Sequence, residues 1–216
     1  MGVGTKSVTL LVAATLAACG SDPRLRVDGS VLERISVENR LLLFDAENEL
    51  DIAIDDRDQL LEEMRALELR RRTALDGQED AERAARRFRD DGDAERAEIA
   101  ALRGDAAGAR LEHLGARRKA TEVRLARQER VLVVAEARFE LAKARLVKRN
   151  NVPGAADLRI EEFEKQVTRY QEKVAAFDER LAEAEAQVAE REEAWSMASA
   201  RLRQASRGAY GSRWLD

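Results

Sequence analysis

The chain of 216 residues has little of what most folds and catalytic sites need: one cysteine, one histidine, two prolines and only 4% aromatic residues. One cysteine excludes a disulfide within the chain, and so few aromatic residues argue against a large globular core. Charged residues make up 37% of the sequence, yet the net charge is only −4. Both signs alternate along the chain, which is typical of a solvated helix surface rather than a nucleic-acid-binding patch. A composition rich in Ala, Glu, Arg and Leu predicts long helices or coiled coil.

Residues with catalytic or metal-binding chemistry are scattered. The only histidine, His113, stands between Leu111 and Leu114, and we expect it on a polar helix surface without a metal. The aspartate clusters at 55–58 and 90–93 lack the spacing of an EF-hand loop. No glycine-rich phosphate loop follows a strand. We therefore expect no metal, no cofactor and no catalytic residue, and we do not expect an enzyme.

The stretch from 160 to 205 repeats apolar residues at alternating steps of three and four. This is an a/d heptad pattern held for about seven heptads, and only Arg191 interrupts it. A helix of this length is roughly 70 Å long, so its apolar seam must be covered by another helix. The seam residues are Ile160, Phe163, Val167, Tyr170, Val174, Phe177, Leu181, Ala184, Val188, Arg191, Trp195, Ala198, Leu202 and Ala205.

A second apolar stripe runs through residues 31–89, which we expect to form one helix. Leu61 and Leu75 widen this stripe, which predicts more than one neighbouring helix. Gly77 is expected to be a tolerated weak point within the helix. The turn residues at 90–93 end the helix, and Asp93 can cap the next one.

A third stripe occupies residues 94–149, and the clearest loop of the chain, 150–154, follows it. Basic residues precede the loop and acidic residues follow it, as suits the end of one helix and the start of another. A short loop predicts that helices 94–149 and 157–206 lie antiparallel. Folding at residue 153 places three pairs together: Leu146 with Ile160, Leu132 with Val174, and Leu111 with Trp195.

The sequence therefore predicts an all-α fold containing a long antiparallel coiled-coil helical hairpin within residues 31–206. The favoured form is a three-helix, rod-like bundle. The alternative is one very long helix, 31–149, with helix 157–206 folded back on its distal half. That alternative leaves the apolar stripe of residues 43–67 uncovered, so it needs a homo-oligomer.

The first 18 residues have the pattern of a secretory signal peptide: Lys6 followed by an apolar run from Val8 to Ala18. The run is too short to span a bilayer in the mature protein. It ends in Leu16-Ala17-Ala18-Cys19, which resembles the lipobox of bacterial lipoproteins. That resemblance implies cleavage between Ala18 and Cys19 and acylation of Cys19, with palmitate among the acyl chains. Residues 19–30 are expected to be the lipidated cysteine and a linker, with Ser30 as the first helix cap.

The resemblance also implies a location. Gly20, the residue after the cysteine, is not the aspartate that retains enteric lipoproteins in the inner membrane, so we expect a lipid anchor in the cell outer membrane, facing the periplasm. At the other end, residues 207–216 form a glycine-containing tail. Tyr210 and Trp214 lie there outside any heptad, either as a docking motif or folded back over the end of the bundle.

These features suggest two kinds of function. The first is a structural spacer, tether or scaffold of the cell envelope, similar in general plan to the murein lipoprotein. That protein is joined to the wall through a C-terminal lysine, whereas this sequence ends in Asp216. The expected partners are membrane lipid and an envelope protein that the sequence does not name, with no nucleic acid.

The second is an accessory or adaptor of an envelope transport or efflux assembly. Residues 137–146, the loop after them and 160–164 resemble the helical hairpin of periplasmic adaptor (membrane fusion) proteins. The β-rich segments that flank the hairpin in that family do not occur in this sequence. A chaperone with helical arms, like the periplasmic holdases, would need a β body that is likewise not found.

Overall fold

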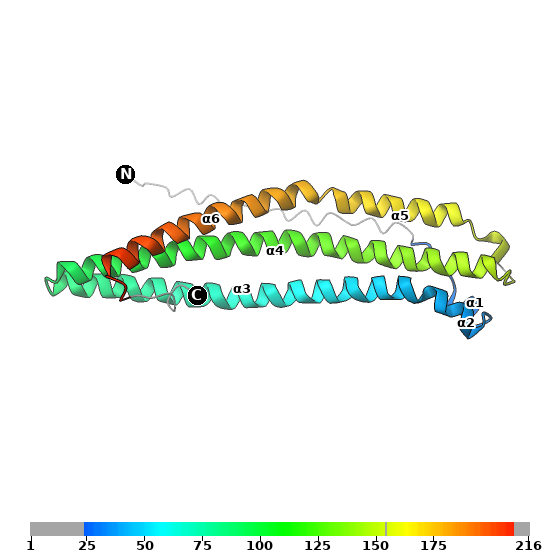
Figure 1. Cartoon of the computed structure of the whole chain (residues 1–216), viewed down its shortest axis with the longest axis horizontal. Helices are drawn as coiled ribbons and strands as arrows, with labels where there is room; N and C mark the ends of the chain where they lie inside the picture. Colours follow the sequence, from blue (N-terminus) through cyan, green and yellow to red (C-terminus); the bar gives the residue numbers. More distant parts are fainter. Residues whose placement is uncertain (1–23, 154, 210–216) are drawn as a thin grey trace, which may run out of the picture.

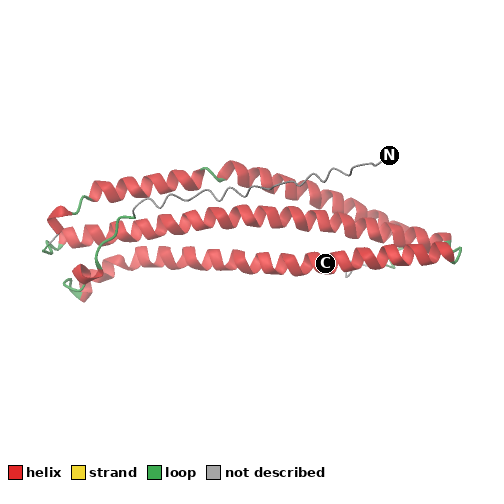
Figure 2. Cartoon of the chain, turned by 180° about the vertical axis from the view of Figure 1, so that it is seen from behind, coloured by secondary structure: helices red, strands yellow, loops and turns green. Residues whose placement is uncertain are grey.

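In the computed structural model, which describes residues 24–153 and 155–209, the chain folds into three long antiparallel helical rods (Figure 1). The first rod is α3 (Phe44–Asp90) and the second is α4 (Ala94–Arg149). The third is divided into α5 (Ile160–Ala175) and α6 (Asp178–Ala205). The prediction of an all-α, up-down-up bundle is confirmed, and Figure 2 shows the same arrangement from behind.

A tight turn at residues 91–93 separates α3 from α4. Gly92 takes a positive φ of +77°, which its missing side chain permits. The Asp93 carboxylate then accepts a hydrogen bond from the Arg96 backbone N–H at 3.1 Å, as an N-cap does. The helix therefore reverses here, and the alternative of one continuous helix 31–149 is wrong.

Helix α4 is the middle of the bundle, with α3 on one side and α5 and α6 on the other. Ion pairs across the α4 interface with α5 and α6 establish the register, because the two residue numbers of each pair add up to nearly the same value. The predicted register, in which Leu146 meets Ile160, is thereby confirmed to within a few residues. The pairs are Arg145–Glu164 at 2.6 Å, Arg124–Glu185 at 2.8 Å and Arg127–Asp178 at 3.0 Å.

Most of the predicted seam is buried or half-buried, but the core is uneven along the rod. Large side chains gather at the end that carries the α4–α5 loop, here called the loop end, where Val147, Phe163 and Tyr170 are buried. Towards the 91–93 turn, here called the turn end, α3 and α4 meet through small residues. The buried alanines of this half are Ala74, Ala81, Ala85, Ala97, Ala100 and Ala106.

The beginning of the first helix differs from the prediction. Residues 29–43, here called the hook, form α1 (Gly29–Leu32), α2 (Val37–Arg40) and the 3-10 turn η1 (Leu41–Leu43) instead of a continuous helix. The cap of α1 is Asp28, not Ser30: the Asp28 carboxylate accepts from the Ser30 N–H at 2.9 Å. Ser36 caps α2 in the same way, so two capping residues in quick succession divide the segment.

Two further predictions about the helices are wrong. The third rod begins at Ile160, after the 3-10 turn η2 (Ala155–Asp157), and it is broken at 176–177. In a straight α-helix an apolar stripe with a 3.5-residue repeat gradually rotates away from the neighbouring helix. After the break, α6 runs along α4 towards the turn end (Figure 1). In α3, Leu61 and Leu75 are exposed and do not widen the apolar stripe.

Candidate functional site

The residues proposed from the sequence as sites, Ala18, Cys19, Tyr210 and Trp214, lie outside the described residues. The candidate sites that remain lie along the bundle, and they begin where the described chain begins.

Residues 24–28, here called the N-terminal segment, do not form a free linker but lie against α4 and α5. The Leu25 N–H donates to Gln166 Oε1 at 3.0 Å, and the Val27 N–H donates to Glu140 Oε2 at 2.7 Å. Arg24 forms an ion pair with Glu136. Two helix side chains thus satisfy the backbone of an extended segment, as a neighbouring strand would do in a sheet.

A cavity of about 200 Å³ lies beneath this segment, between α3, α4 and α5. Lys143 and Glu140 form an ion pair of 2.8 Å beside it, with only 16% of each side chain exposed. The Lys143 ammonium also lies 4.0 Å from the centroid of the Phe139 ring. These charges satisfy one another and hold the N-terminal segment, so the cavity is part of a structural joint.

The hook and the first residue of α3, Phe44, together expose an apolar surface. Val37, Leu41 and Phe44 follow one another at steps of four and three residues, which places them on one face of a helical turn. They are 69%, 67% and 64% exposed, and the adjacent Leu42 is 55% exposed. Exposed apolar side chains that gather in this way mark a surface for a partner or a membrane. These four residues are called the ridge below.

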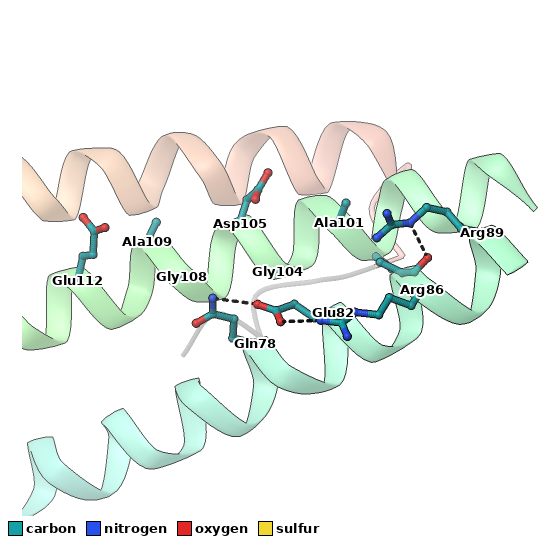
Figure 3. Close-up of a pocket in the computed structure, with 12 residues that line it drawn as sticks. Gln78, Glu82, Arg86, Arg89, Ala101, Gly104, Asp105, Gly108, Ala109 and Glu112 are labelled. Atoms are coloured by element: carbon teal, nitrogen blue, oxygen red, sulfur yellow. Dashed lines mark hydrogen bonds and ion pairs between the residues drawn. The ribbon is translucent and has the colours of Figure 1, made fainter. Parts of the chain in front are cut away.

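A cleft of about 530 Å³ opens between α3 and α4 near the turn end (Figure 3). Gly104 and Gly108 leave room on the α4 side, and the charged side chains of α3 pair along their own helix. Glu82 accepts from Gln78 Nε2 at 3.3 Å and pairs with Arg86 at 3.8 Å. The carboxylates that line the cleft, those of Glu82, Asp105 and Glu112, are exposed, whereas acid–base catalysis uses a desolvated group.

His113 lies where α4 meets α6 and is only 5% exposed, so its predicted place on a polar surface is wrong. Its ring stacks on Trp195 with the centroids 5.3 Å apart. Burial lowers the pKa of His113, although the nearby Glu192 opposes this effect. His113 Nδ1, Trp195 Nε1 and Ser199 Oγ have no hydrogen-bond partner among the described residues, so the polar atoms of this contact are poorly satisfied.

The sequence contained a signal for this burial. A central helix with neighbours on two sides needs two apolar stripes, and Leu111 and Leu114 lie on one of them. The second stripe repeats every seven residues, and its buried members are Ala106, His113, Ala120, Val134 and Leu141.

Neither metal coordination nor membrane spanning is found in the described ranges. Among residues 24–153 and 155–209, no group of three or more His, Cys, Asp or Glu side chains is placed to hold a metal ion. No helix there is both long and apolar enough to cross a membrane. No protein family matches the chain, and no curated protein and no solved structure is similar to it.

Proposed function

We propose that this protein is a lipid-anchored, rod-shaped spacer or tether of the cell envelope, facing the periplasm from the outer membrane. The anchor is Cys19, within the lipobox-like Leu16-Ala17-Ala18-Cys19. The observation that supports the proposal is the docking of the N-terminal segment on α4 and α5, because Arg24, five residues after Cys19 in the sequence, is held in the half of the bundle that carries the loop end.

The distances follow from helix geometry. Arg24 pairs with Glu136, which lies 13 residues, or about 20 Å, from the loop end of α4. Cys19 is five residues before Arg24 in the sequence, and five residues of extended chain span at most about 18 Å, so an anchor at Cys19 would be joined to the loop-end half of the rod through Arg24. From Glu136 to Ala94 at the turn end is about 63 Å. The anchor therefore divides the rod into a membrane end and a distant end.

The distant end is where we place the partner. Helix α6 ends there at Ala205, and Tyr210 and Trp214 follow it in the sequence. We propose that these two aromatic residues dock onto an envelope protein or onto wall material. The rod then keeps this partner at a set distance from the membrane.

The adaptor alternative needs a free hairpin, and here the hairpin of α4 with α5 and α6 is covered. Helix α3 packs along α4, and Asn39 of the hook donates from Nδ2 to Asn150 Oδ1 in the hairpin loop at 2.8 Å. We therefore favour the spacer.

Two measurements test this proposal. Cys19→Ala should release the protein from membranes or leave its precursor uncleaved, and a variant that still matures and sediments with membranes contradicts the anchor. A photoreactive residue at Tyr210 should capture envelope protein or wall material, whereas one at Asp91 in the exposed turn is the matched control at the same end. Capture of an export channel from Tyr210 would instead support the adaptor.

A further inference from the structure

We propose that the ridge of the hook, Val37, Leu41, Leu42 and Phe44, is a second membrane contact that inserts into the lipid surface beside the acylated cysteine. This inference rests on the proposed lipid anchor and extends it: the acyl chains attach the protein, and the ridge determines which end of the rod meets the bilayer.

The backbone of the hook is held in place, so the ridge is a built surface rather than a loose loop. Arg40 donates from Nε to the Ile35 carbonyl and from Nη2 to the Glu33 carbonyl, both at 3.0 Å. Leu43, between the exposed ridge residues, is buried in the core at the loop end. The hook therefore turns Leu43 inward while its neighbours point outward.

The position of the ridge agrees with the position of the anchor. Figures 1 and 2 show α1 and α2 at the loop end, beyond the start of α3. The N-terminal segment runs from this end along α4 as far as Glu136. Arg24, five residues after Cys19 in the sequence, and the ridge thus belong to the same half of the molecule.

The size and charge of the ridge favour lipid over a second copy of the chain. Four side chains cannot bury the roughly 800 Å² per partner of a stable protein interface. A membrane contact can be smaller, because the anchor already holds the ridge at high local concentration near the bilayer. Glu38 and Asp45 lie beside the ridge residues, and the one cation among them, Arg40, donates to the backbone carbonyls of the hook, so burial of apolar surface rather than attraction to anionic lipid drives the contact.

The test compares two positions of equal exposure in the full-length, mature protein. Leu41 of the ridge and Leu69 in the middle of α3 are both 67% exposed, and they lie 28 residues, or about 42 Å, apart along the rod. A photoreactive phenylalanine analogue replaces one or the other, and the membranes are irradiated in the cell. Mass spectrometry then identifies what each position has captured. Far-UV circular dichroism of the purified variants checks that both are folded.

The expected result is a lipid adduct at position 41, at both low and high salt, and none above background at position 69. Loss of this adduct when Val37 and Phe44 are both changed to serine would add support. The proposal is overturned by the absence of a lipid adduct at position 41, by equal lipid adducts at both positions, or by capture of a second copy from position 41.

The same samples test the anchor separately. The mass of the mature N-terminal peptide shows whether Cys19 carries acyl chains, and this readout does not depend on the crosslink. An unmodified cysteine with a lipid adduct at position 41 would reject the anchor and retain the ridge. An acylated cysteine without that adduct would reject the ridge and retain the anchor.

Discussion

The uneven core leads to a prediction about two phenylalanines of the third rod. Phe163 and Phe177 occupy equivalent seam positions in the heptad pattern, so the sequence alone predicts similar costs for their removal. In the structure Phe163 is 4% exposed in the core at the loop end. Phe177 lies at the break between α5 and α6, half-buried, with the Arg180 guanidinium 5.3 Å from its ring centroid.

Phe163→Ala should therefore destabilise the protein much more than Phe177→Ala. A buried phenylalanine truncated to alanine costs about 3–5 kcal/mol, because its transfer energy is lost and a cavity remains. At Phe177 part of the ring already contacts water and the break can relax, so we expect about 1 kcal/mol. In a chain of this size, 1 kcal/mol shifts the melting temperature by about 2–4 °C, so the Phe163→Ala shift should be roughly 6–20 °C.

Thermal and urea unfolding, followed by far-UV circular dichroism, measures both variants. The m-value must stay constant for the comparison of free energies to hold. Equal shifts for the two variants would refute the reasoning, because they would mean that the break does not weaken the packing of Phe177. A larger shift for Phe177→Ala would mean that the third rod is continuous.

Three further predictions use other contacts. Leu146→Cys with Ile160→Cys should form an intramolecular disulfide under mild oxidation, and only intermolecular bonds at this and neighbouring register pairs would contradict the hairpin. Because burial lowers the pKa of His113, the unfolded state binds more protons, so its contribution to stability should fall as the pH drops below about 6.5. His113→Phe keeps a stacked ring and should show a smaller loss of melting temperature between about pH 7 and pH 5; an unchanged pH profile would contradict the burial of His113. Arg191 and Glu112 form an exposed ion pair 2.9 Å apart. A double-mutant cycle with alanine at both positions, measured by unfolding, should give a coupling energy of about 0–1 kcal/mol, and a larger coupling energy would show a buried pair.

The sequence by itself determined the class of fold, its register and most of its boundaries. Heptad periodicity is a local property that each helix carries along its length, so the seam from Ile160 to Leu202 could be read without coordinates. The turn at 91–93 was predictable because glycine and aspartate act on the backbone at their own positions. Loop length then determined that the helices are antiparallel, and this fixed the register of Leu146 with Ile160.

Tertiary structure decided the features that depend on several elements at once. Val27 is buried and the N-terminal segment is docked because Gln166 and Glu140, distant in sequence, offer acceptors to its backbone. His113 is buried because α4 has neighbours on two sides: the heptad stripe that contains it is present in the sequence, but only the tertiary structure shows that a second helix covers that stripe. Phe44 is exposed, although hydrophobic, because the hook turns Leu43 into the core instead. In each case burial depends on what lies opposite a residue in space, which the periodicity of a single helix does not contain.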